Sequence, residues 1–317
     1  MDILYKYMGF LHLLKVSKWY NEFVVYKVGE NLGILLLILS AISQQTEAIL
    51  VKQYVKKHQS RGLFFNAVIC IFATLYFFIT DFDGFALTKG VLPLGIVNSI
   101  MYALGFYMAY LAFLYGPFGL TRLFINFGLI IPVFYGIYFL NEKSTILTYI
   151  SLALLIFSIY LINTKSKKQD LKQKITLKWI IYVLITVVAN ALITIIGKEK
   201  HIIFGASYNN DFLIISLGGA AIILIVLGIV FERKEFKKTL KYGLIYGMGA
   251  GISNGINNLL VLITYNYLSI SIVSPIKTGV GMIMNFAVSI FLYKEKFTKR
   301  QLISIIIGII SIVLMNL

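Results

Sequence analysis

Three ionisable side chains lie inside long apolar segments of this 317-residue chain: Glu47, Arg122 and Lys277. A charge within the hydrocarbon core of a bilayer is costly, so residues of this kind commonly mark a binding site or an ion path. Glu47 is suited to bind a cationic group or to take up a coupling proton; as an alternative, it forms a structural pair with a lysine or arginine. Arg122 and Lys277 are suited to hold a carboxylate or a phosphate, or else they extend toward the headgroups. The first expectation is therefore a polar site within the membrane.

Amide and phenol side chains accompany these charges at helical spacing. Asn98 and Tyr102 are four residues apart, as are Asn254 and Asn258, so each pair shares one face of a helix. These groups donate and accept hydrogen bonds, which suits a hydroxylated or zwitterionic ligand. The alternative is that they hold neighbouring helices together, but their recurrence in both halves of the chain favours binding. The predicted substrate-binding residues are Gln44, Glu47, Asn98, Tyr102, Asn126, Asn190, Asn254, Asn258 and Lys277.

The elements that must position these residues follow from the composition. With 59% hydrophobic and 13% charged residues and a mean hydropathy of +0.86, the chain is not an ordinary soluble domain. A helix that crosses the hydrocarbon core needs roughly 20 apolar residues. We predict an all-α integral membrane protein with ten transmembrane helices, near residues 32–51, 63–80, 91–114, 118–140, 146–163, 178–197, 211–231, 242–266, 270–293 and 301–316.

The membrane pattern runs twice along the chain. The segment VFYGIYFLNEKST at 133–145 is repeated in similar form as FAVSIFLYKEKFT at 286–298, an alignment that places Glu142 on Glu295. A duplicated unit with an odd number of spans inserts its second copy upside down, which is how many secondary transporters build a central site. We therefore predict two inverted five-helix repeats, the first at 31–163 and the second at 178–317, joined by a basic linker at 164–177.

The inverted repeats also predict a pair of gates. Arg122 and Glu295 are expected toward one membrane face, and Lys277 and Glu142 toward the other, so that one charge pair closes while the other opens. Arg122, Glu142 and Glu295 are the predicted gating residues, and Lys277 is expected to contact substrate as well.

Two further features concern helix shape. Gly243, Gly247, Gly251 and Gly255 form a ladder of four-residue spacing, which predicts a packing seam with a neighbouring helix. Pro132 in the middle of the fourth span is expected to kink or unwind that helix, and Asn285 stands at the matching position of the second half.

The basic residues are unevenly distributed between the loops. Nineteen lysines and arginines follow odd-numbered spans, against eight in the amino-terminal tail and the even-numbered loops. The positive-inside rule then predicts that the odd-numbered loops are cytoplasmic and that both termini are outside. Residues 1–30 have helical spacing of apolar and basic side chains, which predicts a helix lying in the headgroup region. A frayed tail, or a start codon placed too early with Met8 as the true start, are the alternatives.

The sequence contains no constellation typical of an enzyme. It has no Gly-rich phosphate loop, no H-E-x-x-H, no G-x-S-x-G and no paired carboxylates within one segment. The single cysteine, Cys70, excludes an internal disulfide and a thiolate metal cluster, and the three histidines are too scattered for a metal site. We therefore expect no catalytic residue, no cofactor, no metal and, from the spread of the charge, no nucleic-acid partner.

Several segments together resemble a known family. They are GPFGL at 116–120, IIPVFYGIYFLNEK at 130–143, SPIKTG at 274–279 and FLYKEKFTKRQLISIIIGIISIVL at 291–314, and they resemble the EamA-type branch of the drug/metabolite transporter superfamily over about 32–317. The resemblance implies a basket of ten helices around a central cavity, lined mainly by the first, third, fourth, sixth, eighth and ninth. It also implies substrates such as amino acids, sugars, nucleotide-linked sugars, phosphorylated metabolites or drugs. Its eukaryotic nucleotide-sugar carriers keep both termini in the cytosol, opposite to the orientation that the charge count favours here.

These observations predict a multi-pass protein of the cell membrane that transports a small polar metabolite by alternating access, without ATP. Export of an amino-acid-like or otherwise charged solute is the favoured direction, and uptake of a sugar or related solute is the nearest alternative. A non-transporting scaffold or sensor and an intramembrane enzyme are alternatives from other classes. The expected partners are the small-molecule substrate, a coupling proton and the lipid bilayer, with the chain as a monomer or a homodimer.

Overall fold

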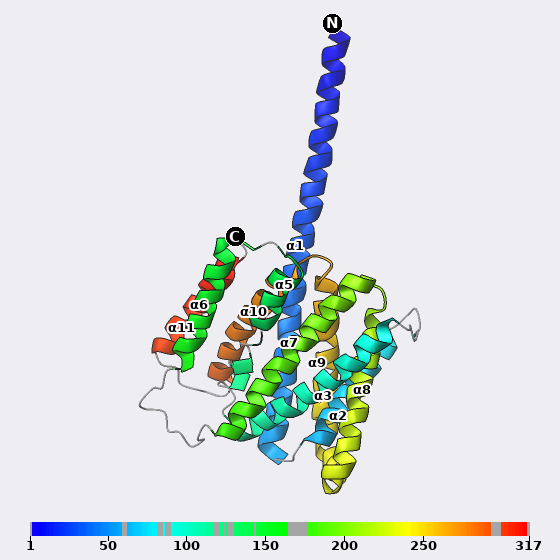
Figure 1. Ribbon diagram of the computed structural model, residues 1–317, viewed down its shortest axis with the longest axis vertical. Helices are drawn as coiled ribbons and strands as arrows, with labels where there is room; N and C mark the ends of the chain where they lie inside the picture. Colours follow the sequence, from blue (N-terminus) through cyan, green and yellow to red (C-terminus); the bar gives the residue numbers. More distant parts are fainter. Residues whose placement is uncertain are drawn as a thin grey trace.

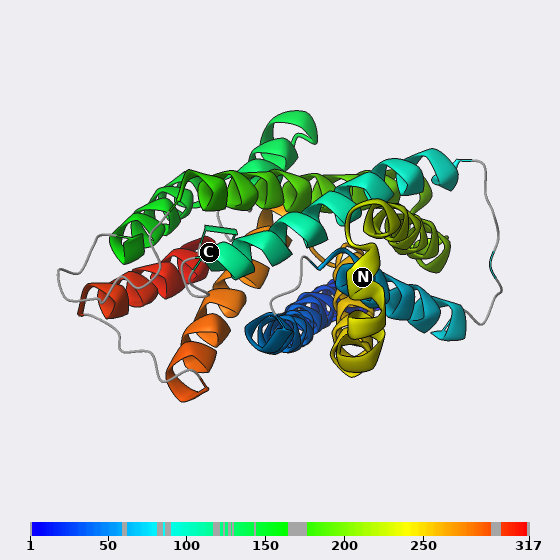
Figure 2. The same cartoon turned by 90° about the horizontal axis from the view of Figure 1, so that it is seen from below.

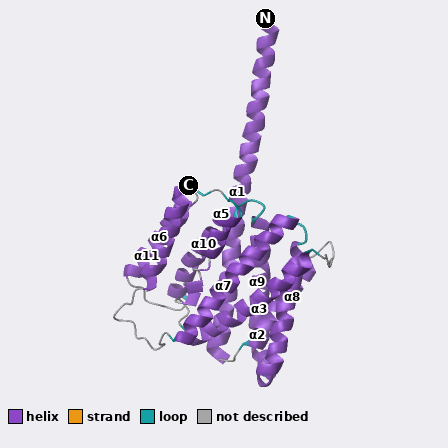
Figure 3. Cartoon of the chain, in the orientation of Figure 1, coloured by secondary structure: helices purple, strands orange, loops and turns teal. Residues whose placement is uncertain are grey.

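The computed structural model describes the backbone of residues 2–58, 62–80, 85, 90–116, 121–122, 124–125, 128, 130–142, 144–163, 176–292 and 299–315. Within these ranges every regular element is a helix (Figure 3). The longer helices are α1 (Asp2–His58), α2 (Leu63–Thr80), α3 (Val91–Tyr115), α5 (Ile130–Phe139), α6 (Ile146–Asn163), α7 (Leu177–Phe204), α8 (Asn209–Phe231), α9 (Phe236–Thr264), α10 (Ile270–Phe291) and α11 (Lys299–Met315). A short 3-10 helix, η2 (Arg233–Glu235), precedes α9.

Each of the ten predicted spans contains a helix, and α2 and α6 begin and end at the predicted residues. Among the described residues, six helices are long and apolar enough to cross a membrane: α1 from Glu30, α2, α3, α7, α8 and α10 as far as Val288. The described part of the chain is thus all-helical and membrane-spanning, while the number of ten spans stays a prediction. α5 has only 10 residues and α11 has 17.

The helix packing has the same pattern in both halves. α1 packs along α9 as α7 packs along α3, α1 meets α10 as α7 meets α5, and α2 meets α9 as α8 meets α3. α2 packs against α8, α6 against α11 and α5 against α10, so each of these pairs joins equivalent helices of the two halves. This pattern fits the predicted two-repeat architecture. In Figure 1, α1 descends and α7 rises, which is the relation that an inverted second half requires.

The glycine ladder forms a packing seam, as predicted. A Cβ at Gly247 would lie 2.5 Å from Cγ1 of Val68, and one at Gly255 would lie 2.7 Å from the Tyr76 ring, so α9 approaches α2 closely along this line. The buried core includes Leu37 of α1, Phe77 of α2 and Leu217 of α8, which belong to one apolar cluster. Large apolar side chains also cover the outer surface, where hydrocarbon replaces water as the solvent.

The pair α6 and α11 lies at one side of the bundle, away from α2 and α8 (Figures 1 and 2). Serine side chains join the two helices: Oγ of Ser158 donates to the carbonyl oxygen of Ser304 at 2.7 Å, and Oγ of Ser311 donates to that of Ser151 at 2.6 Å. These reciprocal bonds satisfy hydroxyl groups that would otherwise be unpaired in hydrocarbon.

Two further predictions concern Pro132 and the amino-terminal segment. Pro132 is the third described residue of α5, and residues 126, 127 and 129 before it lie outside the described part of the chain, so the predicted kink stays a prediction. Residues 2–29 continue α1 in a straight line beyond the bundle (Figure 1), so the predicted helix is present. Its location in the headgroup region stays a prediction.

Candidate functional site

A cavity of about 240 Å³ lies between the two halves of the bundle. Its walls come mainly from α1, α3, α7, α9 and α10, with Arg122 and Pro132 from the fourth predicted span, which agrees with the lining that the family resemblance implied. Nine residues predicted as binding or gating line it: Gln44, Glu47, Asn98, Tyr102, Arg122, Asn190, Asn254, Asn258 and Lys277. Asn126 and Glu295 lie outside the described residues.

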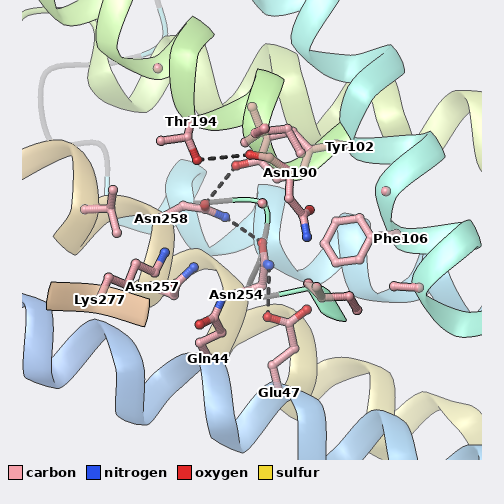
Figure 4. A pocket seen from close by; sticks show the side chains of 18 of the residues that line it. Gln44, Glu47, Tyr102, Phe106, Asn190, Thr194, Asn254, Asn257, Asn258 and Lys277 are labelled. Atoms are coloured by element: carbon pink, nitrogen blue, oxygen red, sulfur yellow. Dashed lines mark hydrogen bonds between the residues drawn. The ribbon is translucent and has the colours of Figure 1, made fainter. Parts of the chain in front are cut away.

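A directed chain of hydrogen bonds crosses this cavity from α3 to α1 (Figure 4). The Tyr102 hydroxyl donates to Oδ1 of Asn258 at 2.8 Å, and Nδ2 of Asn258 donates to Oδ1 of Asn254 at 2.7 Å. Nδ2 of Asn254 then donates to Oε2 of Glu47 at 3.0 Å. Every donor thus points toward the carboxylate, which can only accept when it is ionised, and each bond polarises the next.

Glu47, Arg122 and Lys277 are the charged residues in the described lining of the cavity. Both cations interact electrostatically with Glu47. Nη2 of Arg122 donates to the carbonyl oxygen of Gln44 at 3.3 Å, and its guanidinium lies 5.6 Å from the Phe113 ring centroid. The cavity therefore presents one carboxylate and two cations, a surplus of one positive charge.

Arg122 was expected near one membrane face, as the partner of Glu295 in a gate. It lines the same cavity as Lys277. Glu295 lies outside the described residues, so a gate between the two stays a prediction. Lys277 lines the cavity on the opposite wall from Asn190 (Figure 4).

Two of the predicted amides differ in their surroundings. Asn98 is 1% exposed, and its Nδ2 donates to Oγ of Ser216 at 3.1 Å, so its donor joins α3 to α8 as a helix contact. Asn190 is exposed on the cavity wall, and the Thr194 hydroxyl donates to its backbone oxygen at 3.0 Å. The side chain of Asn190 is thus available to a ligand, whereas Asn98 uses its Nδ2 between helices and keeps a buried Oδ1 with no hydrogen-bond partner among the described residues.

Two further cavity residues carry polar atoms that no hydrogen bond uses. Oδ1 of Asn257 and Oγ of Ser274 are buried and have no hydrogen-bond partner among the described residues. Asn257 follows Asn254 by three positions and Ser274 precedes Lys277 by three, so each shares a helix face with a predicted residue. Sequence reasoning missed Ser274, and its spacing from Lys277 is the signal that could have identified it.

Glu142 lies at one end of the bundle, outside the cavity lining. Its Oε1 and Oε2 accept hydrogen bonds from the backbone N–H groups of Ile270 and Ser271, at 3.1 and 2.9 Å, so it caps the first turn of α10. Its ion-pair partner is Lys198, at 3.8 Å, and not Lys277 as the sequence suggested. Lys277 lies about two turns further along α10 and turns to the cavity instead.

Comparisons with known proteins agree with this architecture. A family model described as the EamA-like transporter family matches residues 31–164 and, a second time, residues 177–317. One solved structure, titled "Crystal structure of protein", aligns with a TM-score of 0.63 at 9% sequence identity, over 92% of this chain and 96% of that chain. At this identity the likeness concerns the fold alone. No curated protein matches the chain.

Proposed function

Because the chain belongs to the EamA-like transporter family, we propose that it is a secondary active transporter that exports a small amino-acid-like or otherwise charged metabolite by alternating access. Family membership makes it a multi-pass membrane transporter of the drug/metabolite type. The ligand class, the direction and the mechanism are the proposal.

The observation that carries the proposed ligand class is that Glu47, Arg122 and Lys277 line one cavity and interact electrostatically. A zwitterionic ligand offers a group of opposite charge to each of these side chains, with its anionic group at Arg122 and Lys277 and its ammonium at Glu47. A neutral sugar offers no group of opposite charge to any of the three, so it gains no charge-assisted contact in the cavity. The amides around them supply donors and acceptors for the remaining polar groups of the ligand.

The volume supports a small ligand. Pockets for drug-sized molecules occupy roughly 300–1,000 Å³, and this cavity holds about 240 Å³. A free amino acid or a metabolite of similar size therefore fits better than a nucleotide-linked sugar. A cavity of this kind also separates a carrier from a scaffold, which has no need of a polar chamber between its halves.

Alternating access needs a closure at each end of the cavity. We propose that Glu142 and Lys198 form the closure at the end where α10 begins, since their side chains are each only 11% exposed. Glu295 is aligned with Glu142 in the sequence repeat and is proposed to act at the other end. A coupling proton at Glu47 completes the proposed cycle.

The test is a thermal-shift screen of the purified full-length protein against a panel of amino acids, sugars and phosphorylated metabolites. A ligand stabilises the state that it binds, by about 2.7 kcal/mol at a concentration of 100 Kd. We expect a zwitterion to raise the melting temperature, and we expect Glu47→Gln and Lys277→Met to abolish the shift. Glu235→Gln, at a half-buried carboxylate paired with Lys238, and Lys237→Met, at an exposed lysine, are matched controls outside the cavity lining that should retain it. A best ligand that is a neutral sugar, bound equally well by both cavity variants, would instead support the uptake alternative.

A further inference from the structure

Gly281 lies four residues after Lys277 on α10, so both face the same side of the helix, and both line the cavity. Three other glycines also line it: Gly105, Gly128 and Gly197. Each of these three faces a neighbouring helix. A Cβ at Gly105 would lie 3.3 Å from Oδ1 of Asn190, one at Gly128 would lie 3.2 Å from the carbonyl oxygen of Val187, and one at Gly197 would lie 3.5 Å from Leu262.

The surroundings of Gly281 are different. A Cβ added there would have no heavy atom within 4 Å among the described residues. Gly281 is nevertheless buried, so the space in front of it is inside the protein and belongs to the cavity. In the described part of the chain, no neighbouring helix needs the missing side chain in order to approach.

The backbone conformation at position 281 also does not require glycine. Gly281 is inside a regular helix, and it is not among the glycines with positive φ, which are Gly62 and Gly205. Glycine is a poorer helix former than alanine because it loses more backbone freedom on folding. A glycine that gives up helix stability without a packing or turn requirement points to a functional use of the space.

The backbone around Gly281 is held in place. Nε2 of Gln45 donates to its carbonyl oxygen at 3.2 Å, which fixes α10 against α1 at this level. The cavity thus contains a bare stretch of backbone about 6 Å along the helix from the Lys277 Cα. This stretch has a fixed position and no side chain.

We infer that Gly281 is a specificity-determining residue: it forms the wall of the subsite that receives the body of the ligand whose anionic group lies at Lys277. The size of the side chain at position 281 then sets the largest ligand that the cavity admits. The inference rests on the proposed function, because it takes the cavity as the place where the ligand binds.

The first experiment needs no identified ligand. Asn190→Cys, on the opposite wall, is placed in a Cys70→Ala background and labelled with a small aminoethyl thiosulfonate and with a bulky aromatic one. Gly281→Leu should lower the labelling rate of the bulky reagent roughly tenfold or more relative to that of the small reagent, and Gly281→Ala should do so to a lesser degree.

Gly197→Ala is the matched control, because it adds the same methyl group to the same cavity region but directs it at Leu262. We expect it to leave the ratio of the two rates unchanged. The melting temperature of Gly281→Ala should equal or exceed that of the parent, since the helix gains a better former without a clash. Equal labelling ratios in Gly281→Ala, Gly281→Leu and the parent would overturn the inference.

The second experiment measures thermal shifts with amino acids of increasing side-chain size. Gly281→Ala should retain the shift with the small members and lose it with the largest ones that bind the parent. If Gly281 served instead as a hinge, its variants would weaken transport of all ligands alike and leave the labelling ratio unchanged. If the parent protein binds no amino acid, the proposed ligand class is wrong, while the labelling ratio still decides the role of Gly281.

Discussion

At the scale of single residues, the main feature is that Glu47 ends a chain of donors that begins at Tyr102. The chain passes through Asn258 and Asn254 and so connects α3, α9 and α1, which belong to both halves of the protein. Its direction depends on an acceptor at the end. A neutral Glu47 could donate a hydrogen bond to Asn254, which would allow the two amides to reverse and would leave the Tyr102 hydroxyl free to donate elsewhere. The charge of Glu47 is therefore communicated to the opposite wall of the cavity.

The first prediction tests this communication with a double-mutant cycle. Tyr102→Phe removes the first donor and Glu47→Gln removes the charged acceptor, and among the described residues hydrogen bonds join the two side chains through the two asparagines. We expect their effects on the free energy of unfolding in mild detergent to be non-additive by about 0.5 kcal/mol or more, because members of one network couple.

The control cycle combines Tyr102→Phe with Gln45→Leu. Gln45 is two residues from Glu47 on the same helix, but its amide donates to Gly281 and takes no part in the chain. The effects of this pair should add. Additivity in both cycles would show that the chain does not transmit the charge of Glu47.

Prediction of cavity-lining residues from the sequence succeeded where the spacing along one helix decides which side chains share a face. Asn254 and Asn258 line the cavity together with Lys277, as expected. The sequence could not show which helix is the neighbour of each face. Asn98 lines the cavity as expected, but its Nδ2 also donates to Ser216 of α8, and nothing in the local spacing indicates that contact.

At the scale of elements, α10 is the helix that joins the proposed site to the proposed closure. Its first turn is capped by Glu142, and its second and third turns carry Lys277 and Gly281. A carboxylate at a helix N-terminus is favourable because it accepts from N–H groups that have no partner within the helix and faces the positive end of the helix dipole. Movement of α10 would therefore change the cap and the cavity wall together.

The ion-pair partner of Glu142 could not be predicted from the sequence, for a physical reason. The repeat alignment correctly singled out Glu142 as a special residue after the fourth span. Its partner Lys198 is 56 positions away, at the end of α7, and only the packing of α7 near α5 brings the two side chains within 3.8 Å. Helix ranges such as 63–80 were predictable because they depend on local composition, whereas this contact depends on the assembled bundle.

The second prediction concerns the closure. Removing one member of a shielded ion pair costs roughly 3–5 kcal/mol because the other charge is left alone. Lys198→Met should therefore favour the state that is open at the Glu142 end. We expect the labelling of Asn190→Cys by a membrane-impermeant thiol reagent, added from that side, to become about tenfold faster, which corresponds to roughly 1.4 kcal/mol.

The charge swap provides the sharper control. Glu142→Lys combined with Lys198→Glu restores an ion pair but removes the acceptor for the N–H groups of Ile270 and Ser271. The swap should restore slow labelling only in part. Full restoration would mean that the cap of α10 contributes nothing, and an unchanged rate in Lys198→Met would remove this pair from the gate. Lys234→Met, an exposed substitution elsewhere, should leave the rate as it is.

At the scale of the whole molecule, the two ends of the bundle differ in charge. The turn between α8 and α9 carries exposed Arg233, Lys234 and Lys237, and the end of α1 adds Lys56 and Lys57. The turn from α8 to α9 and the end of α1 both lie at the lower end of the bundle in Figure 1, whereas α11 ends at the upper side. A basic residue close to an anionic membrane surface gains roughly 1 kcal/mol, so an unequal distribution of such residues has a definite consequence for orientation.

The last prediction is therefore the orientation in the membrane. Nineteen basic residues follow odd-numbered spans, against eight on the other side, four of which are in the tail formed by residues 1–30. Because basic loops stay on the cytoplasmic side and most of them follow odd-numbered spans, a reporter fused after Lys172 should be cytoplasmic and one fused after Leu317 should be outside.

The control shortens the amino-terminal tail. A chain that begins at Met8 loses Lys6 alone of the four tail lysines, and a chain that begins at Asn31 loses all four. If the loop charge determines the orientation, the Asn31 form should report the same two locations more strongly. If the tail determines it, the full chain should report the opposite pair of locations, and only the shortened form should match the prediction.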